Sequence, residues 1–438
     1  MVKKRFFIET YGCQMNFSDS EIVASVLKDH FYEFEPNLKK TNLILINTCA
    51  IREHAEQRVW NRLEHLKALK LKNKNLVVGL LGCMAERLKD ELFAGGVVDL
   101  VVGPDAYREL PKLIESIQAG SKAFNIVLSA EETYADINPV RLDTNDVSAF
   151  ISIMRGCQNY CSYCVVPYTR GKERSRAPET IVAEAQQLFA DGFREITLLG
   201  QNVNSYNYNG VGFAQLIAQV AAVDPQLRIR YATSHPKDLT DELIATLTKH
   251  PNICNSIHLP MQSGSDAVLS RMNRNYTRQF YLNRIQALRK AMPHCSISTD
   301  IIAGFCGETE ADHQDTLSAM RLAHFDYAFM FKYSERGGTR AAEQFADDVP
   351  EQTKAKRLNE IIALQHQLSL ESNKKDLQQS MLVLIEGVSK RSKTQLWGRT
   401  AHNKVVVFTD LQHTAGHYVL VKITDCTSAT LMGEVVSF

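Results

Sequence analysis

Three cysteines in the middle of the chain have the spacing of a metal-cluster loop. They are Cys157, Cys161 and Cys164, in the pattern C-x3-C-x2-C, and they directly follow a strand predicted at residues 149–154. An iron–sulfur cubane normally takes four cysteines. Because no fourth cysteine lies near this loop in the sequence, one iron would stay open to an exogenous ligand, as chemistry at the cluster requires. A zinc loop is the alternative interpretation.

A second set of three cysteines is spread over the first third of the chain. Cys13, Cys49 and Cys83 each follow a predicted strand, and the pattern Ser18-x-x-Glu21 predicts the start of the first helix. Strands that alternate with helices indicate a parallel, doubly wound sheet, whose functional crevice lies at the carboxyl ends of the strands. We therefore expect the three thiols to converge there. The strands are predicted at residues 4–9, 43–46 and 76–81.

The role expected of these cysteines depends on the cellular compartment of the protein. No apolar run reaches the roughly 20 residues of a membrane span, and the apolar stretch at the start ends too soon for a signal peptide. We therefore expect a cytoplasmic protein with no membrane partner, in which the ten cysteines are ligands or buried side chains rather than disulfides. Soft thiolates without histidine favour iron–sulfur clusters. For the first set, three-ligand zinc and three unrelated buried cysteines are the alternatives.

The sequence after the middle loop predicts an incomplete α/β barrel. Five further strands follow the strand before the loop, and the helices between them complete about six βα units. Active sites in such barrels lie at the C-terminal strand ends. The five strands are predicted at residues 195–199, 227–233, 256–259, 296–302 and 327–331. The candidate cofactor-binding residues at the strand ends are Gln201, Asn202, Ser234, His235, Gln262, Ser263, Asp300 and Gly304. Each of them has an alternative interpretation as a strand-end cap or turn residue.

The end of the chain predicts a small OB-like β-barrel after a helical stretch. Its five strands are predicted at residues 381–386, 394–399, 405–408, 418–423 and 431–436. Basic side chains interleaved with an aromatic one suit RNA phosphates and stacked bases. The candidate RNA-binding residues are Lys390, Arg391, Lys393, Trp397 and Arg399. A solvated basic face with a core tryptophan is the alternative.

Length and net charge indicate the number of domains and how a nucleic acid could be bound. Its 438 residues indicate two or three domains, and we expect an α/β protein with domains at residues 1–140, 141–374 and 375–438. The formal net charge is +1, so the molecule as a whole has no strong field. A nucleic-acid partner must therefore be held by a local basic patch.

Several motifs together resemble the methylthiotransferase family of radical S-adenosylmethionine enzymes. The middle loop is similar to the superfamily signature, including the aromatic Tyr163 before the last cysteine. In one departure, Cys306 stands where the family usually has proline in a Gly-Phe-Pro-Gly-Glu-Thr turn, and we do not count it as a ligand. The resemblance covers nearly the full length and ends in a TRAM-like RNA-binding domain. Its other motifs lie at residues 11–16, 47–49, 81–87, 165–171, 199–206 and 262–265.

This resemblance implies a transferase with two 4Fe-4S clusters and S-adenosylmethionine as methyl donor and radical source. The cluster on Cys13, Cys49 and Cys83 would carry a sulfur that one S-adenosylmethionine methylates. The cluster on the middle loop would cleave a second one, and the resulting radical would remove hydrogen from carbon 2 of N(6)-isopentenyladenosine at tRNA position 37. The cofactor carries the difficult step. The resemblance also implies an electron donor and a partner that replenishes sulfur.

Two other functions are compatible with the sequence. A sibling methylthiotransferase would act on threonylcarbamoyl-adenosine in tRNA or on a ribosomal protein. A protein of another class would be a non-catalytic iron–sulfur RNA-binding oxygen sensor, against which the cofactor-type middle loop argues.

Overall fold

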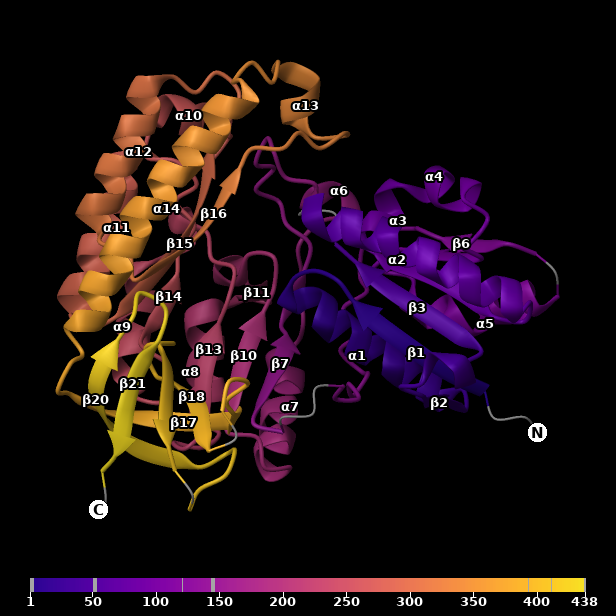
Figure 1. Ribbon diagram of the computed structural model, residues 1–438, viewed down its shortest axis with the longest axis horizontal. Helices are drawn as coiled ribbons and strands as arrows, with labels where there is room; N and C mark the ends of the chain where they lie inside the picture. Colours follow the sequence, from indigo (N-terminus) through magenta and orange to yellow (C-terminus); the bar gives the residue numbers. More distant parts are fainter. Residues whose placement is uncertain are drawn as a thin grey trace. The chain divides into compact units, whose positions relative to one another are not determined.

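The computed structural model describes residues 4–49, 53–119, 121–142, 146–392, 394–410 and 412–436 (Figure 1). The chain forms two compact units. The first contains residues 1–142, 154–160 and 164–176, and the second contains residues 143–153, 161–163 and 177–438. The middle cysteine loop therefore contributes residues to both units.

The first unit is built on a parallel sheet of six strands in the order β2-β1-β3-β4-β5-β6. β3 and β4 are buried along their whole length, as expected for a parallel sheet covered on both faces. The strand order reverses between β1 and β3, so the sheet is doubly wound, as predicted. The strands are β1 (Lys4–Thr10), β2 (Tyr32–Phe34), β3 (Leu43–Thr48), β4 (Val77–Gly82), β5 (Leu100–Val102) and β6 (Ala123–Asn125).

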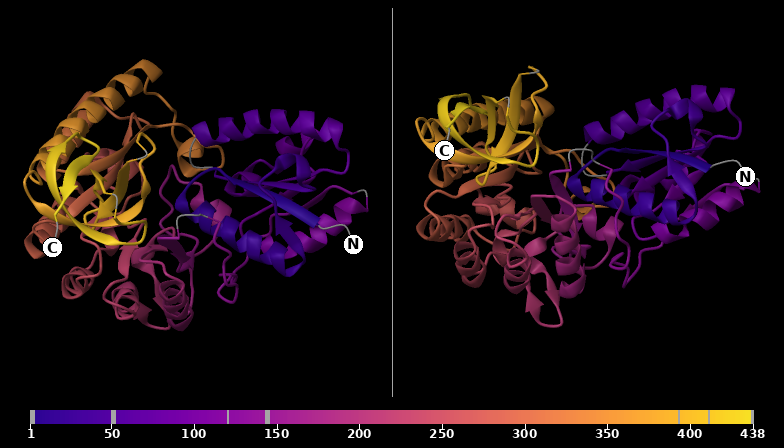
Figure 2. Two further views of the ribbon diagram at one scale, coloured as in Figure 1. Left: turned by 60° about the horizontal axis from the view of Figure 1, so that its bottom comes forward. Right: turned by 90° about the horizontal axis from the view of Figure 1, so that it is seen from below.

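Helices cover both faces of this sheet (Figure 2). Alternate residues of β3 belong to two different cores, because Leu43 and Leu45 pack in one and Ile44 and Ile46 in the other, which follows from the period of two in a strand. The helices of this unit are α1 (Gln14–Asp29), α2 (Glu53–Lys72), α3 (Cys83–Arg87), α4 (Lys89–Ala94), α5 (Leu110–Gln118) and α6 (Val166–Arg170). A short antiparallel pair joins β8 (Met154–Arg155) to β9 (Arg174–Ser175).

The predicted start of α1 is wrong by five residues, because the N-cap is Cys13 and not Ser18. α1 begins at Gln14 with Cys13 as its N-cap, and Ser18 and Glu21 are buried inside the helix. Glu21 does not act as a capping residue, because its carboxylate forms an ion pair with Arg141 at 2.7 Å. The earlier start places Cys13 at a helix N-terminus, where the helix dipole favours a thiolate.

The second unit contains six parallel strands in two sheets, β13-β10-β7 and β14-β15-β16. This confirms the predicted incomplete barrel. The strands are β7 (Ser148–Ser152), β10 (Glu195–Leu199), β13 (Arg228–Tyr231), β14 (Ser256–His258), β15 (Ser296–Ala303) and β16 (Tyr327–Lys332). The hairpin strands β11 (Asn207–Tyr208) and β12 (Val211–Gly212) follow β10. The helices are α7 (Pro178–Ala190), α8 (Phe213–Ala221), α9 (Asp241–Lys249), α10 (Asp266–Arg271), α11 (Arg278–Ala291), α12 (Glu310–Ala323), α13 (Arg340–Gln344) and α14 (Glu351–Lys374).

The C-terminal strands of the second unit close into a barrel in the order β17-β18-β19-β21-β20, which confirms the predicted small barrel. Arg228 of β13 fixes this barrel to the larger one, since its guanidinium donates to the carbonyl oxygens of Arg399 at 2.6 Å and Leu382 at 2.8 Å. The strands are β17 (Ser380–Val388), β18 (Gln395–Thr400), β19 (Val405–Thr409), β20 (Tyr418–Cys426) and β21 (Leu431–Val435). None of the helices in the described part of the chain is both long and apolar enough to cross a membrane.

Candidate functional site

The three N-terminal cysteines lie at one edge of the first unit's sheet. Cys13 follows β1, Cys49 follows β3 and Cys83 follows β4. These three strands are direct neighbours. The pairing of β3 with β4 ends directly before Cys49 and Cys83, and the pairing of β1 with β3 ends at Thr10, three residues before Cys13. The point where the strand order reverses, between β1 and β3, is where doubly wound sheets bind their ligands. The predicted convergence at the strand ends is therefore what the topology produces.

The guanidinium of Arg170 lies near the sulfur atoms of Cys83 and Cys13, and Cys49 hydrogen-bonds with Cys13. The Arg170 Nε donates to the Cys83 Sγ at 3.3 Å. A hydrogen bond with Cys49 and the nearby charge of Arg170 lower the pKa of the Cys13 thiol to about 6, although burial acts in the opposite direction. A thiolate is the form of cysteine that binds metals. The donor set therefore fits an iron–sulfur cluster.

A glycine keeps the backbone close to this site. Gly12 has a φ of +143°, and a Cβ added there would lie 2.5 Å from the Cβ of Cys49. Any larger residue would push the turns that carry Cys13 and Cys49 apart. Glycine is needed here for this close approach as well as for its backbone freedom.

Arg170 is held in place by a buried carboxylate. Its Nη2 lies 2.7 Å from Asp19 Oδ2, and the other oxygen of Asp19 lies 2.8 Å from Nη1 of Arg155. All three side chains are buried. Arg155 belongs to β8, two residues before Cys157, and Arg170 ends α6. One carboxylate thus ties the segments on both sides of the middle cysteine loop to α1. Sequence reasoning included Arg170 in a family motif without giving it a role, and it missed Asp19, because no spacing relates a residue of α1 to one so far along the chain.

In the second unit, a different arginine contacts a cysteine of the middle loop. Nη1 of Arg274 donates to the Cys161 Sγ at 3.2 Å, and Nη2 donates to the carbonyl oxygen of Pro260 at 3.1 Å. Nε of Arg274 donates to the hydroxyl of Tyr276 at 3.0 Å. Tyr163 packs edge-on against Phe305 with its hydroxyl 3.5 Å from Arg274. Arg274 and Tyr276 were not predicted either, since they lie in a loop that has no recognisable cofactor motif.

Buried polar atoms without a protein partner gather after β10 and β13. They include Oε1 of Gln201, Oδ1 of Asn202, Oγ of Ser234 and Nε2 of His235. Burial, together with the charges of Arg274 and Lys237, lowers the pKa of His235 to about 2, so its imidazole is neutral. Because Nδ1 accepts from the backbone N of Lys237 at 3.3 Å, the proton lies on Nε2. These groups are available to a polar ligand.

The predicted residues after β14 and β15 have identifiable structural roles. The backbone N of Gln262 donates to the carbonyl oxygen of Asp300 at 2.8 Å, and Ser263 contacts Thr316 at 3.3 Å between hydroxyls. A Cβ on Gly304 would lie 2.4 Å from Cγ of Lys354, and its φ is +72°. Gln262 also has a φ of +68°, an uncommon conformation for a residue other than glycine that often marks active sites.

Cys306, the residue that departs from the family pattern, lies in an apolar cluster. Its neighbours there include Phe305 and Tyr333, and burial raises the pKa of its thiol. This environment suits a packing residue.

The predicted RNA-binding residues do not share one environment. Lys390 and Arg391 are exposed between β17 and β18, and Trp397 is half-buried on β18. Arg399 instead forms ion pairs with Glu195, at 2.7 Å, and with Glu386, because two buried carboxylates require a cation. This corrects the expectation that Arg399 lies on an open basic face. Lys393 lies outside the described residues.

Among the described residues, no three histidine, cysteine, aspartate or glutamate side chains lie close enough together to bind a single metal ion. An iron–sulfur cubane is held differently, because each thiolate binds an iron of its own.

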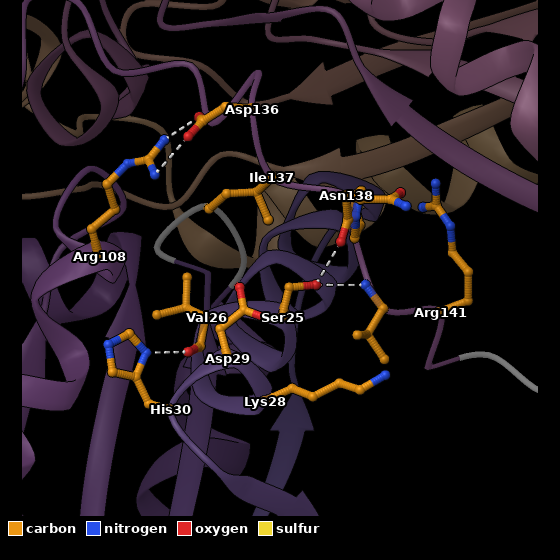
Figure 3. A pocket seen from close by; sticks show the side chains of 12 residues that line it. Ser25, Val26, Lys28, Asp29, His30, Arg108, Asp136, Ile137, Asn138 and Arg141 are labelled. Atoms are coloured by element: carbon orange, nitrogen blue, oxygen red, sulfur yellow. Dashed lines mark hydrogen bonds and ion pairs between the residues drawn. The ribbon is translucent and has the colours of Figure 1, made fainter.

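A cavity of about 770 Å³ opens at the other end of α1 (Figure 3). Its lining includes Ser25 and His30 from the end of the helix, and Arg108, which forms an ion pair with Asp136. The hydroxyl of Ser25 donates to the carbonyl oxygen of Asn138 at 2.8 Å. Since a helix rises about 1.5 Å per residue, the cavity lies roughly 20 Å along α1 from Cys13. It is therefore separate from the cysteine site.

Comparisons with known proteins support the resemblance found in the motifs. Residues 5–103 match the model described as Uncharacterized protein family UPF0004, residues 151–320 the Radical SAM superfamily and residues 375–436 the TRAM domain. The fold is similar to the radical S-adenosylmethionine methyltransferase TsrM from Kitasatospora setae, with a TM-score of 0.61 and 14% identity over 78% of this chain and 77% of that one. At that identity the likeness shows the fold alone.

Two curated relatives cover nearly the whole chain. A tRNA-2-methylthio-N(6)-dimethylallyladenosine synthase from Bacteroides fragilis is 53% identical over 436 residues, which are 98% of this chain and 95% of the relative. The enzyme of the same name from Porphyromonas gingivalis is 53% identical over 441 residues, 99% of this chain and 95% of the relative. The family predicted from the motifs is confirmed. The chain belongs to the tRNA-2-methylthio-N(6)-dimethylallyladenosine synthase family of radical S-adenosylmethionine enzymes.

Proposed function

We propose that this protein is a tRNA methylthiotransferase that adds a methylthio group to carbon 2 of N(6)-isopentenyladenosine, also called dimethylallyladenosine, at position 37. The observation that carries the proposal is the presence of two separate cysteine sites, each with a buried arginine that donates to a cysteine sulfur. One cluster suffices to cleave S-adenosylmethionine. A second site on a different fold element needs a separate role, and the supply of sulfur is the role that the relatives' reaction requires.

At the first site, Cys13, Cys49 and Cys83 would bind a 4Fe-4S cluster with one open iron. When bound, this cluster supplies the sulfur that becomes the methylthio group. Arg170 donates a hydrogen bond to one ligand sulfur and brings a positive charge to a site of three thiolates. Asp19 keeps that guanidinium in position. The protein's part is thus to hold a negatively charged centre at the edge of the sheet.

At the second site, Cys157, Cys161 and Cys164 would bind the other 4Fe-4S cluster. When bound, it supplies the electron that cleaves S-adenosylmethionine. The unpartnered polar atoms of Gln201, Asn202, Ser234 and His235 are suited to the cofactor's carboxylate, amino and ribose groups. A neutral His235 can donate a hydrogen bond without adding charge beside a sulfonium cation. Tyr163, Gln262, Ser263, Asp300 and Gly304 complete the proposed cofactor-binding residues.

The substrate would be the anticodon arm of a tRNA that already carries the isopentenyl group. Lys390 and Arg391 are exposed cations on the small barrel, and Trp397 is an aromatic surface near them. They suit RNA phosphates and a stacked base. We retain the division into domains at residues 1–140, 141–374 and 375–438, and the proposal also requires an electron donor and a partner that replenishes sulfur.

The test is the identity of the product. Anaerobically loaded protein is incubated with S-adenosylmethionine, a low-potential reductant and tRNA with or without the isopentenyl group, and the nucleosides are analysed by mass spectrometry. We expect a methylthio nucleoside with the isopentenylated tRNA alone. Turnover that occurs only with ribosomes or with threonylcarbamoyl-adenosine would identify a sibling enzyme. Absence of 5′-deoxyadenosine would favour the non-catalytic sensor.

A further inference from the structure

Three aromatic side chains form a row on one face of β16. Tyr327, Phe329 and Phe331 alternate along the strand and therefore share a face, and they are 51%, 41% and 37% exposed. Ala328, between the first two, is buried on the opposite face. The rings of Tyr327 and Phe329 meet edge to face with centroids 5.0 Å apart. Large aromatic side chains exposed in a row on a strand point to something that covers them.

The exposed row continues across the sheet. Ser298, Asp300 and Ile302 of β15 pair in register with the three aromatic residues and are partly exposed, and His258 of β14 pairs with Ser298. We call these seven residues the aromatic face: His258, Ser298, Asp300, Ile302, Tyr327, Phe329 and Phe331.

The other side of the same sheet is covered. Ile257, Ile297 and Ile301 are almost completely buried, and α11, α12 and α14 lie on that side (Figure 1). Parallel sheets are normally covered on both faces, and side chains normally fill the inside of an α/β barrel. An aromatic face open to solvent on the inner side of an incomplete barrel is therefore suited to a ligand.

The charges of the aromatic face restrict the ligand. Its seven residues include one carboxylate and no lysine or arginine. Nε2 of His258 lies 3.5 Å from Asp300 Oδ1, and its Nδ1 lies 3.0 Å from the hydroxyl of Ser298. The ring of His258 also meets Phe329 edge to face, with centroids 5.7 Å apart. A groove that follows an RNA backbone needs positive charge, so this face suits a neutral, flat and largely apolar group with a few polar atoms.

We propose that the aromatic face binds the dimethylallyladenosine nucleoside of the tRNA, an inference that rests on the proposed function. The adenine stacks on the aromatic side chains, as unpaired bases stack on sheet aromatics in other RNA-binding proteins. The five-carbon chain, the most apolar part of the substrate, leaves water against the same row. The three aromatic residues span about 13 Å at roughly 3.3 Å per residue, which is long enough for a base and its chain. His258 offers a polar partner to the nucleoside.

The test compares two RNA hairpins on the full-length, anaerobically loaded protein. Both have the sequence of a tRNA anticodon arm, and they differ in carrying either dimethylallyladenosine or adenosine at the target position. The variants are Phe329→Ala and Phe329→Leu. Phe280→Ala is the matched control, because Phe280 on α11 is 38% exposed, similar to Phe331, and lies outside the aromatic face. Iron content and affinity for S-adenosylmethionine without RNA are measured for each variant.

We expect wild-type protein and Phe280→Ala to bind the dimethylallyl hairpin more tightly than the unmodified one. Phe329→Ala weakens binding of the dimethylallyl hairpin by about 10-fold. It weakens the unmodified hairpin less, because that hairpin loses stacking of its adenine but no contact with a five-carbon chain, so the preference for the dimethylallyl hairpin falls. Phe329→Leu keeps part of the preference for the dimethylallyl hairpin, because leucine still offers apolar surface.

Three results would overturn the inference. In the first, Phe329→Ala keeps the wild-type preference. In the second, both hairpins lose the same affinity, which would indicate general base stacking. In the third, S-adenosylmethionine binding falls in the absence of RNA, which would assign the face to the cofactor's adenine. A wild-type protein that neither prefers the dimethylallyl hairpin nor forms the methylthio product would instead contradict the proposed function itself.

Discussion

The two cysteine sites differ in what holds the arginine beside the sulfur. In the first unit, Arg170 is paired with the buried carboxylate of Asp19, which also binds Arg155. In the second unit, the oxygen acceptors of Arg274 are all neutral and come from Pro260, Tyr276 and Tyr163. A guanidinium paired with a carboxylate contributes less net charge to its surroundings than one bound by neutral groups. Arg170 therefore mainly holds chain segments together, whereas Arg274 places a positive charge beside the sulfur of Cys161.

This difference follows from how each site is assembled. Cys13, Cys49 and Cys83 come from three strand ends, so the first site depends on the packing of a whole domain. The middle cysteines come from one short loop, whose spacing is set locally. We call the buried group of Asp19, Arg155 and Arg170 the ionic anchor. It holds separate segments of the chain together, because moving one partner away would leave the other as an uncompensated buried charge.

The largest expected effect separates the two sites by their chemistry. Cys161→Ala should abolish reductive cleavage of S-adenosylmethionine, because the cofactor's cluster loses a ligand. Cys49→Ala should retain cleavage and form no methylthio nucleoside, because the sulfur source is lost. The two products, 5′-deoxyadenosine and the methylthio nucleoside, are quantified separately. Loss of both activities in both variants would refute the division of roles.

A second prediction concerns the ionic anchor. Asp19→Ala leaves Arg155 and Arg170 buried without their shared carboxylate and should lower the free energy of unfolding by about 3–5 kcal/mol. Asp136→Ala is the matched control, because that carboxylate pairs with Arg108 while 72% exposed, and it should cost about 1 kcal/mol or less. Denaturant unfolding of the metal-free chain measures both. Equal losses would mean that the Asp19 pairs are no stronger than a surface ion pair.

The third prediction tests the charge that Arg274 presents to Cys161. Arg274→Met removes a positive charge and a hydrogen bond from the sulfur, both of which favour the reduced cluster, so the midpoint potential should fall. We expect a shift of about 60 mV or more, one factor of ten for a one-electron couple, in a redox titration followed by electron paramagnetic resonance. Arg274→Lys should show a smaller fall in midpoint potential, because lysine restores the positive charge. A potential that stays at the wild-type value in Arg274→Met would remove this arginine from the control of the cluster.

The smallest effect extends the comparison to the small barrel. Replacing both Lys390 and Arg391 by alanine should weaken tRNA binding and reduce the slope of log K against log salt by about 1 to 2, because two phosphate contacts are lost. Arg399→Ala should lower stability and leave that slope unchanged, since its charge is paired with Glu195 and Glu386. If the double variant kept the wild-type slope, the exposed pair would not contact RNA.

The sequence predicted the elements better than the contacts between them. Buried apolar runs identified β3, β4 and β10, and their turns located Cys49 and Cys83, because a strand's burial and its end are local properties. The start of α1 was missed, since Ser18 and Glu21 imitate a capping box while Glu21 pairs with Arg141 across the fold. Arg399 was assigned to the wrong environment for a similar reason.

The residues that complete the two sites could not be predicted from local patterns. Asp19 and Arg170 meet across a large sequence separation, and Arg274 reaches Cys161 from the loop after α10. Such pairs are determined by tertiary packing. A single sequence contains no signal that relates their positions.

The most direct test of two clusters on two cysteine sets is the iron content of the protein and its cysteine variants. After anaerobic purification and reconstitution, the wild-type chain should hold about eight iron and eight sulfide atoms. The variant lacking Cys13, Cys49 and Cys83 should hold about four, and so should the variant lacking Cys157, Cys161 and Cys164. A wild-type chain with about four iron atoms, or one with zinc bound by Cys13, Cys49 and Cys83, would contradict the account.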